Sequence, residues 1–136
     1  MRLFFDNCVA RAMADAVALL ARAQRVEVVH LTEQFDPSTP DVEWIRALRG
    51  QDVVLVSGDT RITRNPVERA AWQESALTAF FLDDGWSSKK FWVQAGELVR
   101  WCPVVIETAR SCAPESGYRL PFKGGEPKLI YEPPVR

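Results

Sequence analysis

Residues 52–59 read Asp-Val-Val-Leu-Val-Ser-Gly-Asp, and this stretch decides the fold of the chain. Its β-branched and aliphatic run is typical of a strand that is buried on both faces in a parallel sheet. Gly58 and Asp59 end the run, because glycine and aspartate favour turns and are depleted in strands. The segment therefore predicts an inner strand of an α/β domain, with Asp59 at its carboxyl end.

Strand and helix patterns alternate before this strand. Apolar residues predict strands over residues 3–5 and 25–31, and helical spacing of apolar residues predicts helices over residues 9–20 and 41–50. Thr39 and Pro40 are typical of the cap and first position of the second helix, and Gly50 is typical of its end.

The alternation continues after the strand. Asn65, Pro66 and Glu68 form the pattern of a capping box at the start of a helix over residues 65–74, and residues 76–82 predict a fourth strand. Ser87 and Ser88 are expected to cap the next helix, and Pro103 predicts the start or kink of a further helix that reaches about residue 111. Alternating strands and helices favour a three-layer α/β/α sandwich with a mainly parallel sheet of at least four strands.

The last 24 residues differ in composition, because they hold five of the nine prolines and three of the seven glycines. Turn-forming residues at this density predict irregular chain. We therefore expect one domain over residues 1–112 and an irregular proline-rich tail over residues 113–136 that packs on it.

Composition excludes several functional classes. Hydrophobic residues make up 47% of the 136-residue chain and charged residues 26%, as in a globular domain. No apolar run approaches the roughly 20 residues of a membrane-spanning helix, and no signal-type apolar stretch opens the sequence, so we expect a cytoplasmic protein with no membrane partner. Three unpaired-looking cysteines and one histidine, His30, exclude a zinc ribbon, a disulfide scaffold and a multi-histidine metal site.

Carboxylates are therefore the main candidate reactive groups, and most aspartates follow predicted strands. In a parallel sheet the ligand site lies outside the carboxyl ends of the strands. Asp6 ends the first strand, Asp59 ends the third, and Asp83 with Asp84 end the fourth. Carboxylates gathered at one edge repel each other, and oxygen ligands favour Mg²⁺ or Mn²⁺, so the pattern predicts a metal site.

The acids at the start of the second helix have two interpretations. Asp41 and Glu43 are ordinary first-turn acids that favour the positive end of the helix dipole, or one of them belongs to the metal site. Arg61 and Arg64 follow Asp59 closely, and their guanidinium groups suit phosphate contact.

The order and spacing of three motifs resemble the PIN-like nucleases, and most closely their VapC-type toxin branch. These motifs are Leu3-Phe4-Phe5-Asp6-Asn7, residues 40–45 (Pro-Asp-Val-Glu-Trp-Ile) and residues 54–59 (Val-Leu-Val-Ser-Gly-Asp), and the resemblance spans about residues 1–110. It implies a PIN fold, bound Mg²⁺ or Mn²⁺, and cleavage of RNA by the toxin of a toxin–antitoxin pair, with a cognate antitoxin protein as partner. In this resemblance Asp6 is the first-strand acid, Asp41 or Glu43 the second acid and Asp59 the acid at the end of the third strand. The usual fourth acid has no counterpart between residues 50 and 56, so Asp83 substitutes for it or the site has three acids.

Together these observations predict a metal-dependent endoribonuclease in which Asp6, Asp41, Asp59 and Asp83 form the catalytic metal site and Arg61 and Arg64 hold substrate phosphate. A homodimer is also expected, because Trp44 and Trp72 exceed what a four-strand core should bury. Two alternatives remain at this stage: a catalytically degenerate PIN-like binding module, and a receiver-like or phosphatase-like α/β domain. Metal affinity distinguishes an intact site from a degenerate one.

Overall fold

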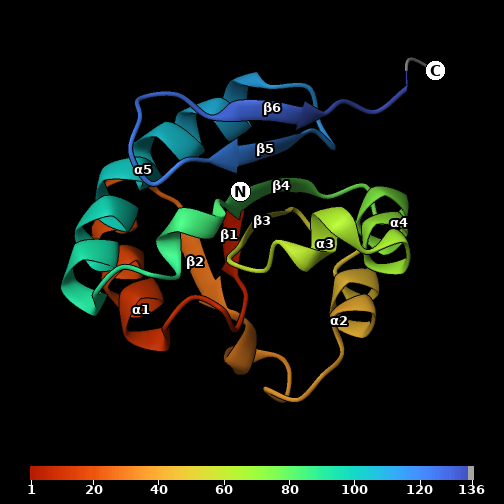
Figure 1. Cartoon of the computed structure of the whole chain (residues 1–136), viewed down its shortest axis with the longest axis horizontal. Helices are drawn as coiled ribbons and strands as arrows, with labels where there is room; N and C mark the ends of the chain where they lie inside the picture. Colours follow the sequence, from red (N-terminus) through yellow and green to blue (C-terminus); the bar gives the residue numbers. More distant parts are fainter. Residues whose placement is uncertain (135–136) are drawn as a thin grey trace.

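A six-stranded sheet forms the centre of the protein, whose computed structural model describes residues 1–134 (Figure 1). The strand order is β2-β1-β3-β4-β5-β6, and only β6 is antiparallel to its neighbour. The strands span Arg2–Phe5 (β1), Glu27–His30 (β2), Val53–Ser57 (β3), Thr78–Leu82 (β4), Gly117–Leu120 (β5) and Lys128–Tyr131 (β6). The predicted mainly parallel sheet is confirmed, and β3 is an inner strand that is buried along its whole length.

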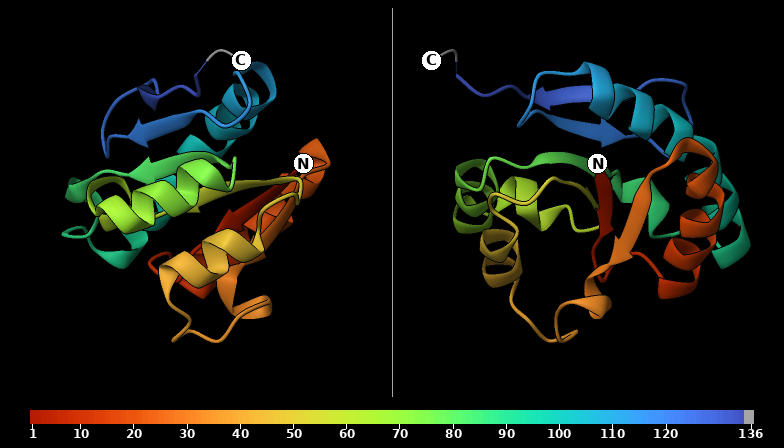
Figure 2. Two further views of the ribbon diagram at one scale, coloured as in Figure 1. Left: turned by 90° about the vertical axis from the view of Figure 1, so that its right-hand side faces the viewer. Right: turned by 180° about the vertical axis from the view of Figure 1, so that it is seen from behind.

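Helices cover both faces of this sheet, as expected for a three-layer sandwich (Figures 1 and 2). One face carries α1 (Arg11–Ala21) and α5 (Phe91–Ser111), and the other carries α2 (Asp41–Ala47), α3 (Arg61–Arg64) and α4 (Pro66–Glu74). Three short 3₁₀ turns, η1 (Arg22–Gln24), η2 (Leu31–Glu33) and η3 (Asp84–Trp86), join these elements.

The inner strands β1, β3 and β4 contribute side chains to two hydrophobic cores, because successive side chains point to opposite faces of a sheet. In β1, Leu3 and Phe5 pack in the core beneath α1 and α5, and Phe4 packs in the core beneath α2 and α4. In β3, Val54 and Val56 join the first core while Leu55 joins the second. Burial on both faces explains why β3 has no polar residue before Ser57.

The segment after residue 112 contains two strands where the sequence predicted irregular chain. β5 pairs in parallel with β4, with Leu120 beside Leu82, and β6 pairs antiparallel with β5. Gly117 makes this pairing possible, because its Cα lies against the ring of Trp72 and a Cβ would collide with that ring. The prolines and glycines therefore form the turns around two strands that extend the central sheet.

Two helix starts, and the continuity of the helix at Pro103, also differ from the sequence prediction. Pro40 rather than Thr39 is the residue before α2, and Lys90 rather than a serine precedes α5. α5 runs as one helix through Pro103, because the residues on either side of the proline, including Trp101 and Val105, are buried in the core and hold the segment helical. No helix among residues 1–134 is both long enough and apolar enough to cross a membrane.

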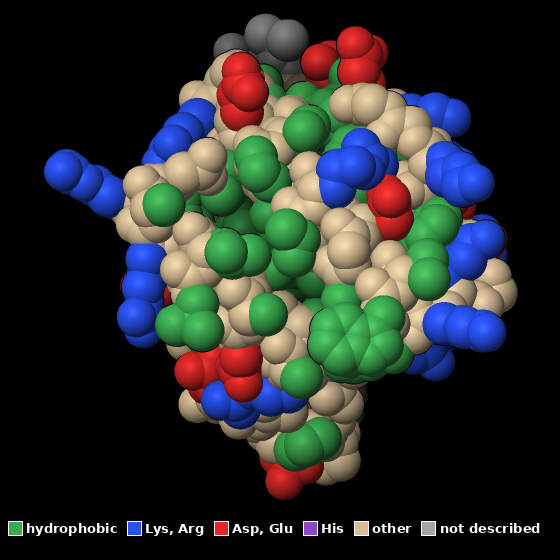
Figure 3. All heavy atoms as spheres, turned by 90° about the vertical axis from the view of Figure 1, so that its left-hand side faces the viewer, with side chains coloured by type: hydrophobic (Ala, Val, Ile, Leu, Met, Phe, Trp, Pro, Cys, Tyr) green, Lys and Arg blue, Asp and Glu red, His purple; other side chains and the backbone are tan. Residues whose placement is uncertain are grey.

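The tryptophans that suggested a dimer are buried. Trp44 is 1% exposed and stacks on Phe4, and Trp72 is 0% exposed with its indole N–H donating to the Leu77 carbonyl oxygen. The strongly exposed tryptophan is Trp92, at 82%, on the outer side of α5. Apolar side chains gather on the face formed by α1 and α5, as Figure 3 shows.

Candidate functional site

The site lies at the point of the sheet where the order of consecutive strands reverses. The chain passes from β1 to β2 on one side, and then crosses to β3 on the other side of β1. Loops leave the carboxyl ends of β1 and β3 in opposite directions there, and such a switch point is the usual ligand site of an open parallel sheet. Asp6 follows β1 and Asp59 follows β3, and both line a cavity of about 410 Å³ at this point. We call this cavity the acid pocket.

Asp6 lies at the bottom of the acid pocket and is 2% exposed. Its Oδ1 atom accepts hydrogen bonds from the backbone N–H groups of Cys8 (3.1 Å) and Gly58 (3.2 Å), and its Oδ2 atom accepts one from the Ser57 hydroxyl. Burial raises the pKa of Asp6 to about 6, and these three hydrogen bonds oppose the shift only in part. Asp6 therefore ties the ends of β1 and β3 together.

Asp59 lies beside Asp6, and Ser57 connects the two residues by accepting a hydrogen bond from the Asp59 backbone N–H at 3.0 Å. Arg61 binds both Asp59 oxygens, with its Nε atom 3.0 Å from Oδ1 and its Nη2 atom 2.8 Å from Oδ2. Partial burial raises the pKa of Asp59, but the hydrogen bonds from Arg61 outweigh it, so the pKa is lowered and the carboxylate stays ionised.

Asp41 reaches the pocket from the first residue of α2. Its Oδ1 atom accepts a hydrogen bond from the indole N–H of the buried Trp44 at 3.0 Å, and its Oδ2 atom lies 4.0 Å from Nη2 of Arg61. Partial burial and the neighbouring Asp59 carboxylate raise the pKa of Asp41 to about 6. Glu43 is exposed and does not line the pocket, so the structure brings Asp41 rather than Glu43 to the site.

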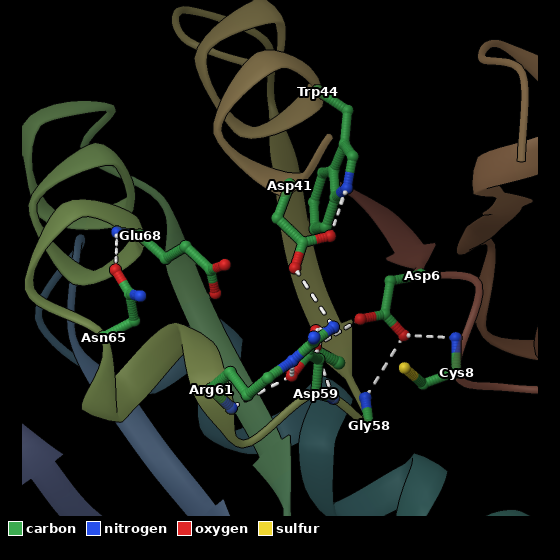
Figure 4. A network of polar contacts seen from close by, with 10 residues as sticks. Asp6, Cys8, Asp41, Trp44, Gly58, Asp59, Arg61, Asn65 and Glu68 are labelled. Atoms are coloured by element: carbon green, nitrogen blue, oxygen red, sulfur yellow. Dashed lines mark hydrogen bonds and ion pairs between the residues drawn. The ribbon is translucent and has the colours of Figure 1, made fainter. Parts of the chain in front are cut away.

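Glu68 is a fourth acid in the pocket, although its sequence pattern predicts the reciprocal acid of a capping box at the start of α4. Asn65 caps α4, because its side-chain oxygen accepts hydrogen bonds from the backbone N–H groups of Val67 and Glu68. The Glu68 side chain points toward Asp41 and Asp59 instead of back to the cap (Figure 4). Its Oε2 atom is buried and has no hydrogen-bond partner within residues 1–134.

Asp41, Asp59 and Glu68 form the cluster that suits a cation. Each offers one carboxylate oxygen, and the three oxygens lie within 4.8 Å of one another. Three carboxylates at this separation repel each other unless a positive charge lies between them, and all-oxygen ligands suit Mg²⁺ or Mn²⁺. A buried carboxylate oxygen without a partner also costs free energy unless it binds a donor or a metal. The residues present therefore fit a divalent cation.

Two residues predicted for this site lie outside the acid pocket. Asp83 follows β4, one strand further along the sheet, and its side chain accepts a hydrogen bond from the Asp84 backbone N–H at the start of η3. Arg64 pairs with Asp84 at 2.7 Å. Both line neighbouring hollows rather than the acid pocket.

The family model described as a PIN like domain matches residues 1–84. The chain belongs to the PIN-like domain family. The match covers β1 through β4, so Asp6, Asp41, Asp59 and Glu68 all lie within this PIN-like domain. No curated protein and no solved structure matches the chain. PIN-like domains are generally nucleases, and the three-acid cluster is compatible with divalent-metal binding and with that activity.

Proposed function

We propose that the protein is a metal-dependent endoribonuclease that uses Mg²⁺ or Mn²⁺ held by Asp41, Asp59 and Glu68. The proposal rests on the buried Oε2 atom of Glu68, which has no hydrogen-bond partner in the described part of the chain and faces two further carboxylates in a PIN-like domain. A bound divalent cation generates a nucleophilic water at neutral pH and stabilises the leaving oxygen of a phosphodiester.

The residues of the acid pocket have separate roles in this proposal. Asp59 is the strongest candidate ligand, because its lowered pKa keeps it ionised across the neutral range. Asp6 positions the loop that carries Asp59, through Ser57 and Gly58, and has few free acceptor sites of its own. Arg61, whose side chain is 74% exposed, balances the charge of Asp59 and is placed to contact a phosphate oxygen in the pocket.

The proposal extends to biological role. A VapC-type toxin acting on RNA in the cytoplasm, and held inactive by a cognate antitoxin protein, is consistent with the PIN-like domain and with the three motifs described from the sequence.

The proposed ribonuclease activity is tested by cleavage of two labelled single strands of the same base sequence, one RNA and one DNA. The RNA is expected to be cut with Mg²⁺ or Mn²⁺ and to stay intact with EDTA. Cleavage that continues in EDTA, or an intact RNA under every condition, contradicts the proposal.

Glu68→Gln is expected to raise the Mn²⁺ concentration needed for half-maximal cleavage about tenfold, because the variant loses one charged group beside the metal. Glu74→Gln is the matched control, because Glu74 is exposed on the same helix and does not line the acid pocket. Cleavage measured over a Mn²⁺ series provides the comparison. Equal half-maximal concentrations for the two variants would show that Glu68 has no part in metal binding.

We also propose a homodimer. Because Trp44 and Trp72 are buried, the surface that supports it is formed by other residues, on α1 and α5. Six large hydrophobic side chains of α1 and α5 are exposed, namely Leu19, Leu20, Phe91, Trp92, Val93 and Val99, and apolar side chains gather on this face of the molecule (Figure 3). Apolar area of this kind favours association. Light scattering at micromolar concentration is expected to give twice the mass of one chain, and Trp92→Ser is expected to give the mass of one chain. A wild-type protein with the mass of a single chain refutes the dimer.

A further inference from the structure

A second hollow of about 410 Å³ lies beside the acid pocket and is lined by arginines from three different elements. Arg64 comes from α3, Arg69 from α4 and Arg119 from β5, and Thr60, Thr63 and Asp83 complete its polar lining. We call it the arginine pocket. The acid pocket is lined by carboxylates and one arginine, so the two neighbouring hollows have opposite charge.

Two of the three guanidinium groups form no ion pair with a carboxylate of residues 1–134. Arg64 forms an ion pair with Asp84 at 2.7 Å. Arg69 donates a hydrogen bond to the Thr63 carbonyl oxygen at 2.9 Å, which fixes its position without neutralising it. Arg119 makes no hydrogen bond and no ion pair with any residue from 1 to 134, although its charge helps to lower the pKa of Asp84 after the hydrogen bond from Arg64. The arginine pocket therefore presents two positive charges that no ion pair within residues 1–134 neutralises, against one carboxylate in its lining, that of Asp83.

The sheet places Arg119 level with the end of β3. Ser57 of β3 is paired with Phe81 of β4, and Phe81 is paired with Arg119 of β5. Arg119 thus lies at the same height in the sheet as the residue that hydrogen-bonds Asp6. Because β5 is parallel to β3, the loop after Arg119 leaves from the same edge that carries the acids.

A third hollow of about 340 Å³ connects the two pockets along this edge. It shares Cys8 with the acid pocket, and it shares Thr60 and Asp83 with the arginine pocket. Thr60 is also the residue between Asp59 and Arg61 in the chain. The three hollows therefore follow one another, from the acids to the free arginines.

We propose that the arginine pocket binds a phosphate group of a single nucleic-acid strand that also passes through the acid pocket. The inference rests on the proposed nuclease function and adds to it the direction in which the strand crosses the protein. A nucleic-acid strand carries one negative charge on each phosphate. When one phosphate lies at the metal in the acid pocket, the adjacent phosphates must lie elsewhere on the protein surface. Guanidinium groups bind phosphate oxygens through paired hydrogen bonds, and Arg69 and Arg119 are free to do so. The arginine pocket is as large as the acid pocket, and the third hollow lies between them, as a strand requires but a free phosphate ion does not.

The test is the affinity of the full chain for a labelled single-stranded RNA, measured by fluorescence anisotropy in EDTA over a series of salt concentrations. EDTA prevents cleavage by a metal-dependent enzyme, so binding is measured separately from catalysis. Arg119→Gln is expected to weaken binding about tenfold, as the loss of a charged hydrogen bond predicts. The slope of log affinity against log salt is expected to fall by about 0.7, the value for one phosphate contact on a single strand. Arg119→Lys keeps the charge and is expected to retain the wild-type slope.

Arg49→Gln is the matched control, because the Arg49 side chain is also exposed and makes no hydrogen bond or ion pair within residues 1–134, but Arg49 precedes β3 at the opposite edge of the sheet. It is expected to bind RNA as the wild type does. Equal affinity and slope for Arg119→Gln and the wild type overturn the inference. Inorganic phosphate that displaces the RNA at the same total phosphate concentration also overturns it, since the pocket then holds a free anion. A protein that binds RNA through Arg119 but never cuts it contradicts the proposed nuclease and leaves this inference standing.

Discussion

Asp59→Asn is expected to lower the rate of RNA cleavage about a thousandfold, which corresponds to about 4 kcal/mol of lost transition-state stabilisation. The substitution keeps the shape of the side chain but removes the negative charge that stays ionised beside Arg61. Asp59 is close to every other acid of the pocket. Hydrogen bonds through Ser57 connect it to Asp6, and its carboxylate belongs to the cluster with Asp41 and Glu68.

The matched control for this variant is Asp15→Asn. Asp15 is an exposed residue of α1 whose carboxylate pairs with Arg11, and it lies outside the acid pocket. Cleavage rates of the two variants on the same RNA, with circular dichroism to verify folding, provide the measurement. A folded Asp59→Asn variant that cuts RNA as fast as Asp15→Asn would remove Asp59 from the active site.

The second large effect is on stability, which is expected to fall as pH rises from about 4 to about 7 in the absence of a divalent cation. The pKa of Asp6 is about 6 in the folded protein against 3.8 ordinarily, so between these values the folded chain binds more protons than the unfolded chain. Under that condition the free energy of unfolding decreases with pH. A shift of this size at a buried group corresponds to about 3 kcal/mol. Asp41, whose pKa is also raised, adds a smaller contribution because it is more exposed.

Groups with lowered pKa do not reverse this trend in the same window. The pKa values of Asp36, Asp59 and Asp84 lie below the ordinary value, so their contribution is lost only as pH falls below about 4. Denaturant unfolding in EDTA at pH 4.5, 6 and 7.5 tests the trend. A free energy of unfolding that rises steadily across this range would show that Asp6 does not carry a raised pKa.

Mn²⁺ is expected to reverse this loss of stability. Protons compete with the cation for Asp41, so stabilisation is expected to be larger at pH 7.5 than at pH 5. At a hundredfold excess over its dissociation constant, a cation bound only by the folded state adds about 2.7 kcal/mol. An equal rise in melting temperature at both pH values, or an unchanged rise in Asp59→Asn, would contradict the metal site.

The sequence predicts the centre of this structure well, because the decisive information is local. The buried run of β3 identifies an inner parallel strand, and the rule that ligands bind at the carboxyl ends of such strands leads directly to Asp6 and Asp59. Asp41 was one of two possible acids in the first turn of α2. The choice between Asp41 and Glu43 depends on the rotation of that helix about its axis, which the buried Trp44 fixes by packing on Phe4.

Glu68 was missed because a local pattern gave it another role. Asn65, Pro66 and Glu68 match a capping box, and in that motif the acid points back to its own helix start. The available signal was position: α4 follows α3 directly after the end of β3, so its first turn lies beside Asp59. Asp83 was assigned to the site by the same strand-end rule that succeeds for Asp6, but β4 lies one strand away from the switch point.

The C-terminal strands depend on contacts that are distant in the sequence. β5 forms only because β4 offers an unpaired edge, and it fits beside Trp72 only because Gly117 has no Cβ to collide with that ring. Local composition, rich in proline and glycine, gives no information about that edge. The same limit applies to Trp44 and Trp72, because both are buried in the core between the sheet and the helices α2 and α4, which brings together residues that are distant in the sequence.

Titration calorimetry of Mn²⁺ into the metal-free protein at pH 7.5 is the decisive measurement for the metal site, because it detects binding of the cation without RNA, antitoxin or dimer. Asp41, Asp59 and Glu68 are expected to bind the cation with release of protons, and Asp59→Asn is expected to show no binding while Asp15→Asn binds as the wild type does. A wild-type protein that takes up no Mn²⁺, or an Asp59→Asn variant that binds it with unchanged affinity, would contradict the account.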